Sequence, residues 1–264
     1  MRKALGAGCL LLISLSAAGQ GTPATPPRPG YVLIHEEIAK PSMLVQYEAT
    51  TRDINKALTD THADPKNFAM NLYVTSDMHY LYVWPIANWA AIDAMQQNFV
   101  SLGQTIGQDR WRDLMNRGNS AMYSYNEFVA QLRPDLSYVP ATPRLKPEER
   151  RFVHWIFYYV DAAHMQEAEQ VAKDYAALFR AKNIADPFTT YQVVSGNDLP
   201  ILVAAVPAKS AADYYANDEK VNAALGADVQ PLAARALAIT RKYEVRDGIY
   251  RPDLSYPVVA TEKK

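Results

Sequence analysis

Apolar residues along this chain form strand-like runs and helical stripes that follow one another in the same order twice. Two runs rich in β-branched and aromatic residues, 31–38 (YVLIHEEI) and 152–160 (FVHWIFYYV), have the length and composition of strands. A helical stripe follows each run, because apolar residues then recur with the spacing of one helix face. The stripes consist of Leu44, Tyr47, Ile54 and Leu58 in the first case and of Ala168, Val171, Tyr175 and Leu178 in the second.

The pattern downstream completes the same unit in both halves. The first half predicts strands at 68–75 and 79–86, a helical region at 89–117 and a closing strand at 121–132. The second half predicts strands at 190–194 and 201–206, a helical region at 211–242 and a closing strand at 243–250. Gly107 and Gly226 are expected to interrupt the two helical regions. The order β-α-β-β-α-β is that of a ferredoxin-like unit, so the sequence predicts an α+β chain with two tandem units.

An exact repeat supports this internal duplication. The segment Arg-Pro-Asp-Leu-Ser-Tyr occurs at 133–138 and again 118 residues later at 251–256. Proline ends a strand because it lacks the N–H donor, and aspartate bonds to nearby backbone, so we interpret both copies as structural clasps that anchor each closing strand. The alternative is a docking surface for a protein partner.

Composition divides the chain into segments. The basic pair Arg2-Lys3, an apolar run and small residues near position 18 are typical of a secretory signal peptide, so we expect a periplasmic or secreted protein. No later apolar run is long enough to suggest a membrane span. The predicted segments are a signal peptide at 1–19, a Pro-rich tether at 20–30, a first unit at 31–138, a linker at 139–150, a second unit at 151–258 and a tail at 259–264.

The faces of the predicted strands indicate how the two units pack. A four-stranded sheet with both helices on one side leaves its other face uncovered. In the strand at 152–160 both alternating faces are apolar. We therefore expect the two units to pack sheet to sheet about a pseudo-two-fold axis within a monomer.

In element order and duplication, the chain from Tyr31 to about Val258 resembles the dimeric α+β-barrel superfamily. That grouping includes cofactor-independent quinone-forming monooxygenases, stress-responsive barrel proteins and haem-binding chlorite dismutase-like enzymes. The resemblance implies a barrel made of two ferredoxin-like units. It does not by itself imply a function.

Charge and cysteine content narrow the classes of partner and chemistry. The formal net charge is −1 and no basic stripe is present, which argues against nucleic acid as a partner. Cys9, within the predicted signal peptide, is the only cysteine, so a disulfide or thiolate metal site is not expected in the mature chain.

Few residues suggest catalysis. The histidines do not form a metal-binding pair at helical spacing, and we predict neither a metal nor another cofactor. His164 falls in the first turn of a predicted helix. In a haem-binding barrel the histidine ligand is expected further along a helix that lines the pocket. The weak catalytic candidates are His35, whose strand position lets it converge with Glu37, and Glu127, whose counterpart in the repeat is Val245.

Aromatic side chains are plentiful and could line a pocket or simply pack the core. The residues predicted to contact a ligand are Tyr73, His79, Tyr125, Trp155, Tyr191 and Tyr243. We therefore favour a non-catalytic binding or interaction protein that holds a small apolar or aromatic ligand between its two sheets. The alternative is a cofactor-independent monooxygenase-like enzyme with His35 or Glu127 as the base.

Overall fold

The computed structural model describes residues 30–257, so the predicted signal peptide, nearly all of the tether, and the tail lie outside the described residues. The first half consists of β1 (Tyr31–Ala39), α1 (Leu44–Asp60), α2 (Pro65–Phe68), β2 (Asn71–Thr75), β3 (His79–Ile86), α3 (Ala90–Ile106), α4 (Gln108–Ala121) and β4 (Met122–Leu132). The second half consists of β5 (Phe152–Val160), α5 (Met165–Ala181), β6 (Thr189–Ser195), β7 (Ile201–Ala208), α6 (Ala211–Leu225), α7 (Gln230–Ala238) and β8 (Thr240–Tyr250). Short 3-10 turns η1 (Pro41–Met43) and η4 (Ala162–His164) precede α1 and α5.

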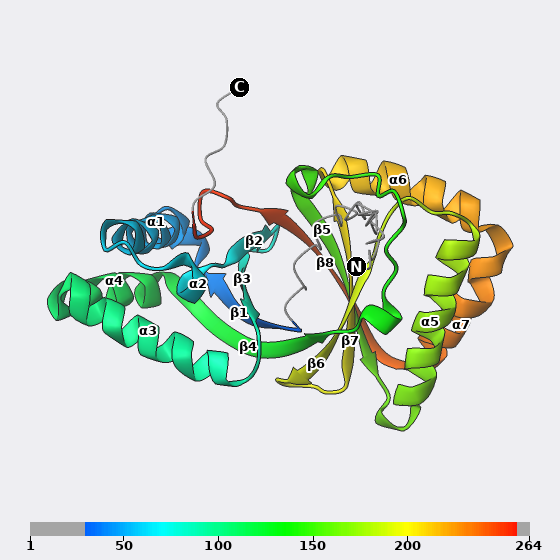
Figure 1. The fold of residues 1–264 in the computed structure, drawn as a ribbon, viewed down its shortest axis with the longest axis horizontal. Coiled ribbons are helices and arrows are strands. Elements are labelled where there is room, and N and C mark those ends of the chain that lie inside the picture. The colour runs from blue at the N-terminus through cyan, green and yellow to red at the C-terminus, as the bar shows by residue number, and fades with distance from the viewer. Residues whose placement is uncertain (1–29, 258–264) are drawn as a thin grey trace, which may run out of the picture.

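The strands within residues 30–257 form one closed antiparallel barrel in the order β1-β3-β2-β8-β5-β7-β6-β4. The predicted α+β barrel is therefore confirmed. Each half contributes four strands in the same relative order, and the ladders β2–β8 and β4–β6 join the halves edge to edge. The barrel occupies the middle of the molecule, with α1–α4 at one end of the long axis and α5–α7 at the other (Figure 1).

The interior of the barrel is filled by side chains from alternate strand positions. Its buried apolar cluster draws on both halves and comprises Ile34, Leu81, Ala130, Phe157, Tyr159, Val193, Ile201 and Val203. Gly248 makes room for Trp155, since a Cβ at Gly248 would lie 2.2 Å from the indole ring. The expected place for a ligand, between the two sheets, is thus occupied by packed side chains, and this part of the prediction is corrected.

A buried polar contact crosses the same interior. The Glu36 carboxylate is 5% exposed, and one of its oxygens lies 2.5 Å from both Arg246 Nη1 and His79 Nδ1. Glu36 and His79 belong to the first half and Arg246 to the second. Because a buried carboxylate needs a charged or hydrogen-bonding partner, this contact fixes how the two halves face each other.

The predicted helices cover the outer faces of the two half-sheets. Tyr47 and Leu58 of α1 and Val171 of α5 are buried, as the apolar stripes predict. The helical regions are interrupted at Gly107 and Gly226, which adopt positive φ angles of 93° and 60°. No helix in the described range 30–257 is long and apolar enough to cross a membrane.

Several element boundaries differ from the predicted ones by a few residues, and two of these differences have a clear structural cause. The strand expected from residue 68 starts at Asn71, because the Asp64 side chain accepts a hydrogen bond from the backbone N–H of Lys66 and begins α2 instead. The helix expected to reach residue 242 ends at Ala238, because β8 pairs with β5 from Thr240 onward.

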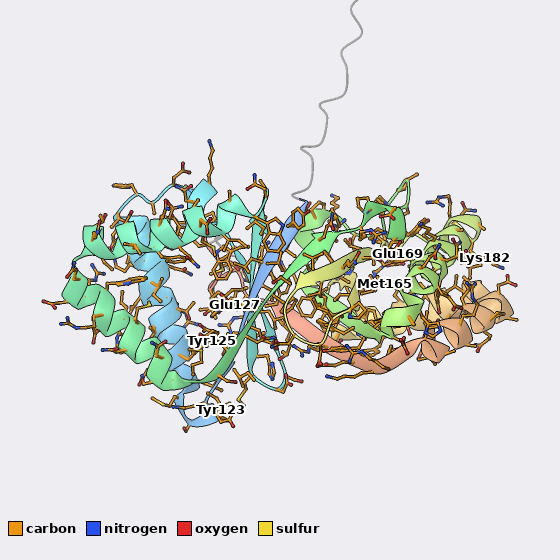
Figure 2. All side chains as sticks on the ribbon, turned by 90° about the horizontal axis from the view of Figure 1, so that it is seen from below. Tyr123, Tyr125, Glu127, Met165, Glu169 and Lys182 are labelled. Carbon is orange, nitrogen blue, oxygen red and sulfur yellow. The ribbon has the colours of Figure 1, made fainter. Side chains whose placement is uncertain are left out.

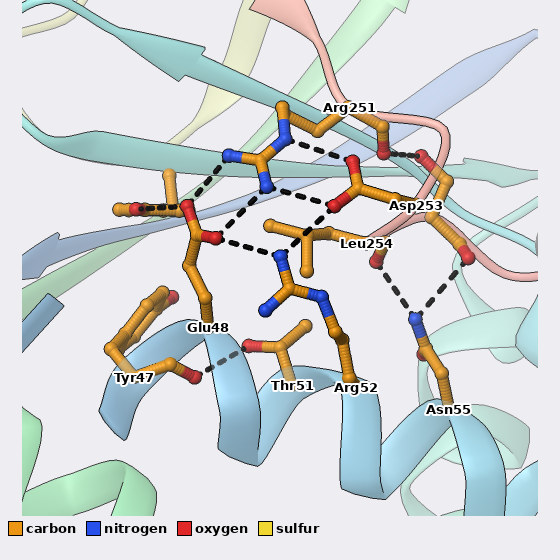
Figure 3. Close-up of polar contacts among 10 residues, drawn as sticks. Tyr47, Glu48, Thr51, Arg52, Asn55, Arg251, Asp253 and Leu254 are labelled. Atoms are coloured by element: carbon orange, nitrogen blue, oxygen red, sulfur yellow. Dashed lines mark hydrogen bonds and ion pairs between the residues drawn. The ribbon is translucent and has the colours of Figure 1, made fainter. Parts of the chain in front are cut away.

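Both repeated segments act as clasps, and each one docks on the opposite half. Arg251, after the last strand of the second half, donates hydrogen bonds to Glu48 of α1 at 2.6 and 2.9 Å and to Asp253 at 2.8 Å (Figure 3). Arg133, after β4 of the first half, donates to Glu169 of α5 at 2.7 Å and to Asp135 at 2.8 Å. The arginine therefore pairs with the aspartate of its own segment, and not with that of the other copy.

Backbone contacts and burial complete the clasps. Asn55 Nδ2 of α1 donates to the carbonyl oxygens of Leu254 and Ser255 at 2.9 and 3.2 Å (Figure 3). Leu136 and Leu254, one in each segment, are both 0% exposed. Because the two leucines are buried, they offer no apolar surface to a protein partner. A partner at the two segments therefore stays a prediction.

The clasp at Arg251 predicts how stability responds to acid. The Arg251 guanidinium lowers the pKa of Glu48 from 4.5 to about 2, so its stabilising effect is complete above pH 4.5 and is lost as pH falls towards 2. Arg251→Met should lower the free energy of unfolding at pH 7 by about 2 kcal/mol. The variant should also flatten the loss of stability in this acidic range.

Urea unfolding from pH 2 to pH 7 measures both effects. Arg112→Met is the matched control, because Arg112 pairs with Asp109 on an exposed helix surface where an ion pair contributes little. Equal pH profiles for Arg251→Met and the unmodified protein would contradict a stabilising clasp.

Candidate functional site

The outer face of each half-sheet, where it meets its helices, is the place at which the two halves differ most. The first half carries a cluster of polar side chains there, which we call the His35 cluster: His35, Glu37, Tyr47, Tyr82 and Glu127. The second half carries an apolar cavity, which we call the second-half cavity.

The two catalytic candidates from the sequence, His35 and Glu127, lie in contact within the His35 cluster. They are register partners on β1 and β4, and His35 Nδ1 lies 2.9 Å from a Glu127 carboxylate oxygen. Glu37 follows two residues along the same strand face, and its carboxylate oxygen lies 3.0 Å from His35 Nε2. The imidazole is therefore held between two carboxylates, an arrangement in which both ring nitrogens donate.

A chain of hydroxyls continues from Glu37 into the space beneath α1. Tyr47 donates a hydrogen bond to the second Glu37 oxygen, and its own hydroxyl lies 2.9 Å from that of Tyr82. The Thr51 hydroxyl lies 3.3 Å from Tyr82. Burial raises the pKa of Tyr47 and of Tyr82, so both phenols stay protonated at ordinary pH.

The other end of the cluster is open to solvent. Tyr125 stacks on the His35 ring at 5.3 Å and is 63% exposed, and the Glu127 side chain is 53% exposed. Figure 2 shows Tyr123, Tyr125 and Glu127 following one another along β4. The hydrogen-bonded chain thus runs from the surface at Glu127 to buried hydroxyls at Tyr47 and Tyr82.

The charge state of His35 follows from two opposing effects. Burial by itself would lower the pKa of His35. The hydrogen bonds and negative charges of Glu37 and Glu127 together outweigh burial, so the pKa is raised above its usual 6.5. The protonated imidazole is the form that this site stabilises.

The second-half cavity lies between the outer face of its half-sheet and helices α5, α6 and α7. Its volume is about 400 Å³. The apolar wall comes from Ile156 and Leu202 on the sheet, from Val171 and Phe179 on α5, and from Val221 on α6. A cavity of this size and lining is typical of sites for small organic molecules.

The cavity exists because small side chains replace large ones at corresponding positions. The two halves can be aligned because α1 and α5 are both 17 residues long and both follow a 3-10 turn, and because the strands share register. The pairs with a smaller second-half member, first half before second, are Tyr47 with Ala168, Thr51 with Ala172, Tyr82 with Ala204 and Trp84 with Val206, while His35 with Ile156 exchanges a polar side chain for an apolar one of similar size. All five second-half members line the cavity.

A few polar groups also line the cavity. The hydroxyls of Tyr158, Tyr175 and Tyr214 make no hydrogen bond to another residue in the part of the chain that the structure describes. Burial raises the pKa of all three, so they are neutral donors. Arg144, from the predicted linker, is held by Asp186 at 2.7 Å and by Asp213 at 2.8 Å.

The six side chains predicted to bind a ligand lie elsewhere. Those within the barrel interior are Tyr73, His79, Trp155 and Tyr191, while Tyr125 and Tyr243 lie on the outer faces of β4 and β8. None of the six is among the residues that line the second-half cavity. The sequence feature that corresponds to the cavity is the small size of Ala168 and Ala204, which align with tyrosines in the first half. The ligand-site prediction did not use this feature.

The residues that line the cavity do not fit a haem. Haem iron in proteins is held by histidine, cysteine, methionine or tyrosinate. Histidine, cysteine and methionine are absent from the described lining, and burial disfavours ionisation of its tyrosines. His164 does not line the cavity, and its side chain is 47% exposed near the start of α5.

Comparison with known proteins gives similarity in fold alone. No family model and no curated protein matches the chain. Solved structures do match: an anthrone oxidase-like protein has a TM-score of 0.53 at 8% identity and covers 84% of this chain and 91% of its own. A variant of chlorite dismutase from Candidatus Nitrospira defluvii has a TM-score of 0.52 at 10% identity and covers 84% and 91%.

A proposed monooxygenase from Fusobacterium nucleatum subsp. nucleatum is similar to the same degree. Its TM-score is 0.51 at 9% identity, and the match covers 83% of this chain and 91% of that one. The chain therefore shares the fold of the dimeric α+β-barrel superfamily, as its element order predicts. At these identities the likeness carries no activity from one protein to the other.

The His35 cluster predicts a pH dependence of stability with a definite sign. Since the pKa of His35 is raised by folding, its contribution to stability is complete below pH 6.5 and is lost as pH rises through the folded value. Glu37→Gln should lower the His35 pKa more than Glu127→Gln does, because the Glu37 side chain is 19% exposed and that of Glu127 is 53% exposed.

NMR titration of the His35 ring protons in the three proteins tests this ordering. The double variant Glu37→Gln/Glu127→Gln should lose the upward shift altogether. An unchanged His35 titration in that double variant would show that the two carboxylates do not set the charge of the ring.

Proposed function

We propose that this protein binds a small, largely apolar aromatic molecule in the second-half cavity. The observation that carries the proposal is the replacement of Tyr47 and Tyr82 by Ala168 and Ala204 at corresponding places of two otherwise similar halves. A cavity in a folded core costs stability, so one that is opened by several coordinated substitutions is better explained by an occupant than by loose packing. Its volume of about 400 Å³ suits a ligand of two or three fused rings.

The lining supports an aromatic ligand with few polar groups. Phe179, Phe188 and Tyr214 offer ring surfaces on which a planar molecule can pack. The neutral hydroxyls of Tyr158 and Tyr175 can each donate one hydrogen bond to an oxygen of the ligand. This lining is the reason to prefer binding in the second half over an interaction module with a fully packed interior.

The proposal treats each half as a ferredoxin-like unit in a monomer with internal pseudo-symmetry. In that arrangement the first half keeps a filled, polar outer face and the second half carries the ligand. Export through the signal peptide expected at 1–19 belongs to the same proposal, and it makes the periplasm or culture medium the compartment in which to search for the natural ligand.

A cofactor-independent oxidation of the bound molecule is the second candidate function. Proteins of similar fold are described as an anthrone oxidase-like protein and a proposed monooxygenase, which makes oxidation of an aromatic compound a reasonable extension. Within this chain it is favoured by a histidine and aspartate pair, His154 and Asp247, that lies beside the same cavity.

Filling the cavity with the first half's own residues tests the binding proposal. Ala168→Tyr/Ala204→Tyr introduces at the cavity the counterparts of Tyr47 and Tyr82, whose hydroxyls lie 2.9 Å apart in the first half. Naphthalene, measured by isothermal titration calorimetry, should bind to the unmodified protein and lose at least about tenfold in affinity in the double variant, because the space it needs is occupied.

Ala177→Tyr is the matched control, since Ala177 is an exposed residue of α5 that does not line the cavity. Native mass spectrometry of protein isolated from its own host should show a co-purified molecule in the control and not in the double variant. Equal affinities for naphthalene in all three proteins would rule out the second-half cavity as the binding site.

A further inference from the structure

A buried histidine pairs with a partly buried aspartate on the outer face of the second half-sheet. His154 of β5 is 7% exposed, and its Nδ1 lies 2.7 Å from an Asp247 carboxylate oxygen of β8. The Tyr215 hydroxyl of α6 donates to the other Asp247 oxygen at 2.7 Å. Neither residue of the pair has a role in closing the barrel or in the clasps.

The fold itself does not require this pair. The corresponding positions in the first half hold Leu33 and Val129, which are register partners on β1 and β4 and are 5% and 4% exposed. A buried polar pair generally gives no more stability than well-packed apolar side chains of similar volume. The presence of His154 and Asp247 in one half only therefore points to a role other than stability.

The pair lies at the edge of the second-half cavity. Ile156, which lines the cavity, is the next residue on the same face of β5, and Val206, which also lines it, is the register partner of His154 on β7. Tyr214, a third lining residue, stacks on the His154 ring with centroids 4.2 Å apart and planes at 17°. His154 does not itself line the cavity, but cavity-lining residues flank it on three sides.

Asp247 also fixes the orientation of the imidazole. When Nδ1–H donates to the carboxylate, the lone pair of a neutral ring is on Nε2. Within residues 30–257 no hydrogen bond reaches His154 Nε2. Nε2 therefore carries the lone pair that would accept a proton from a ligand.

The charges around the cavity favour a ligand that arrives neutral. The titratable side chains near His154 are Asp247 on β8 together with Tyr214, Tyr215 and the neighbouring Asp218 on α6. The cationic lining residue Arg144 is engaged by Asp186 and Asp213. An anionic compound would meet mostly negative charge and would bind poorly.

We propose that His154 accepts a proton from a neutral aromatic compound with a weakly acidic hydroxyl bound in the second-half cavity. The O–H bond of the ligand breaks, its electron pair stays on the oxygen, and the proton bonds to Nε2. The hydroxyl of Tyr214, whose ring stacks on His154 at the cavity, is a donor that can hydrogen-bond to the resulting oxyanion. This step rests on the binding proposed above, and it would supply the electron-rich anion that a cofactor-independent oxidation needs.

The optical titration of bound 4-nitrophenol tests this proton transfer, since the anion of this phenol absorbs at longer wavelength than its neutral form. At a pH below its solution midpoint, the ratio of anion to phenol should be about tenfold higher for the bound compound than for the free one. The variant His154→Leu/Asp247→Val reproduces the first half's Leu33 and Val129 pair, so it should fold. Naphthalene binding to this variant, measured by calorimetry, checks that its cavity is intact, and bound 4-nitrophenol should stay in the neutral form.

Asp247→Asn provides a second, more conservative variant, because it keeps a hydrogen-bond acceptor for Nδ1 but removes the charge. It should give an anion ratio between those of the unmodified protein and the double variant. The proposal is overturned if bound 4-nitrophenol stays neutral in the unmodified protein, or if all three proteins give the same ratio. If naphthalene binds while 4-nitrophenol is not ionised, only proton transfer fails; if naphthalene does not bind either, the proposed binding function fails with it.

Discussion

The barrel can close only if the end of each half reaches the other half, and the two clasps are the contacts that hold it there. The joining ladders are short, since β2 meets β8 only from Tyr73 to Thr75 and β4 meets β6 over a similarly brief stretch. Arg133 and Arg251 continue from these strands onto α5 and α1 of the opposite half. The halves are thereby interlocked, and the helices that shape both outer faces are fixed relative to the sheet behind them.

That interlocking allows the two outer faces to differ without loss of the fold. In the first half, Tyr47 and Tyr82 fill the space between α1 and the sheet and are themselves satisfied by Glu37 and Thr51. In the second half, Ala168 and Ala204 leave that space open, while α5 is still anchored from outside by Arg133 through Glu169. The fold tolerates the cavity because α5 is held by contacts other than those that larger side chains at Ala168 and Ala204 would make.

Much of the architecture could be predicted because it depends on sequence patterns that occur in both halves of the chain. Strand and helix periodicity, the glycine breaks and the repeated clasp all follow from local chemistry, and the duplication makes each prediction check the other. The direction of the clasps could not be predicted, since a segment such as Arg133–Asp135 does not reveal which half it contacts. The cavity could not be predicted either: Ala204 in a strand is typical of ordinary core, and only its alignment with Tyr82 in a folded frame shows the missing volume.

Each half-sheet carries a histidine and carboxylate pair on its outer face, His35 with Glu127 in the first half and His154 with Asp247 in the second. Both join the first and last strands of a half on its outer face, yet they occupy non-corresponding positions: His35 aligns with Ile156, whereas His154 aligns with Leu33. They are therefore different sites, and neither is the counterpart of the other. His35 is held between Glu37 and Glu127, which commits both ring nitrogens to donation and favours the imidazolium. His154 has a single carboxylate partner and, within residues 30–257, no hydrogen bond to Nε2, so of the two it is the one that the proposed proton transfer can use.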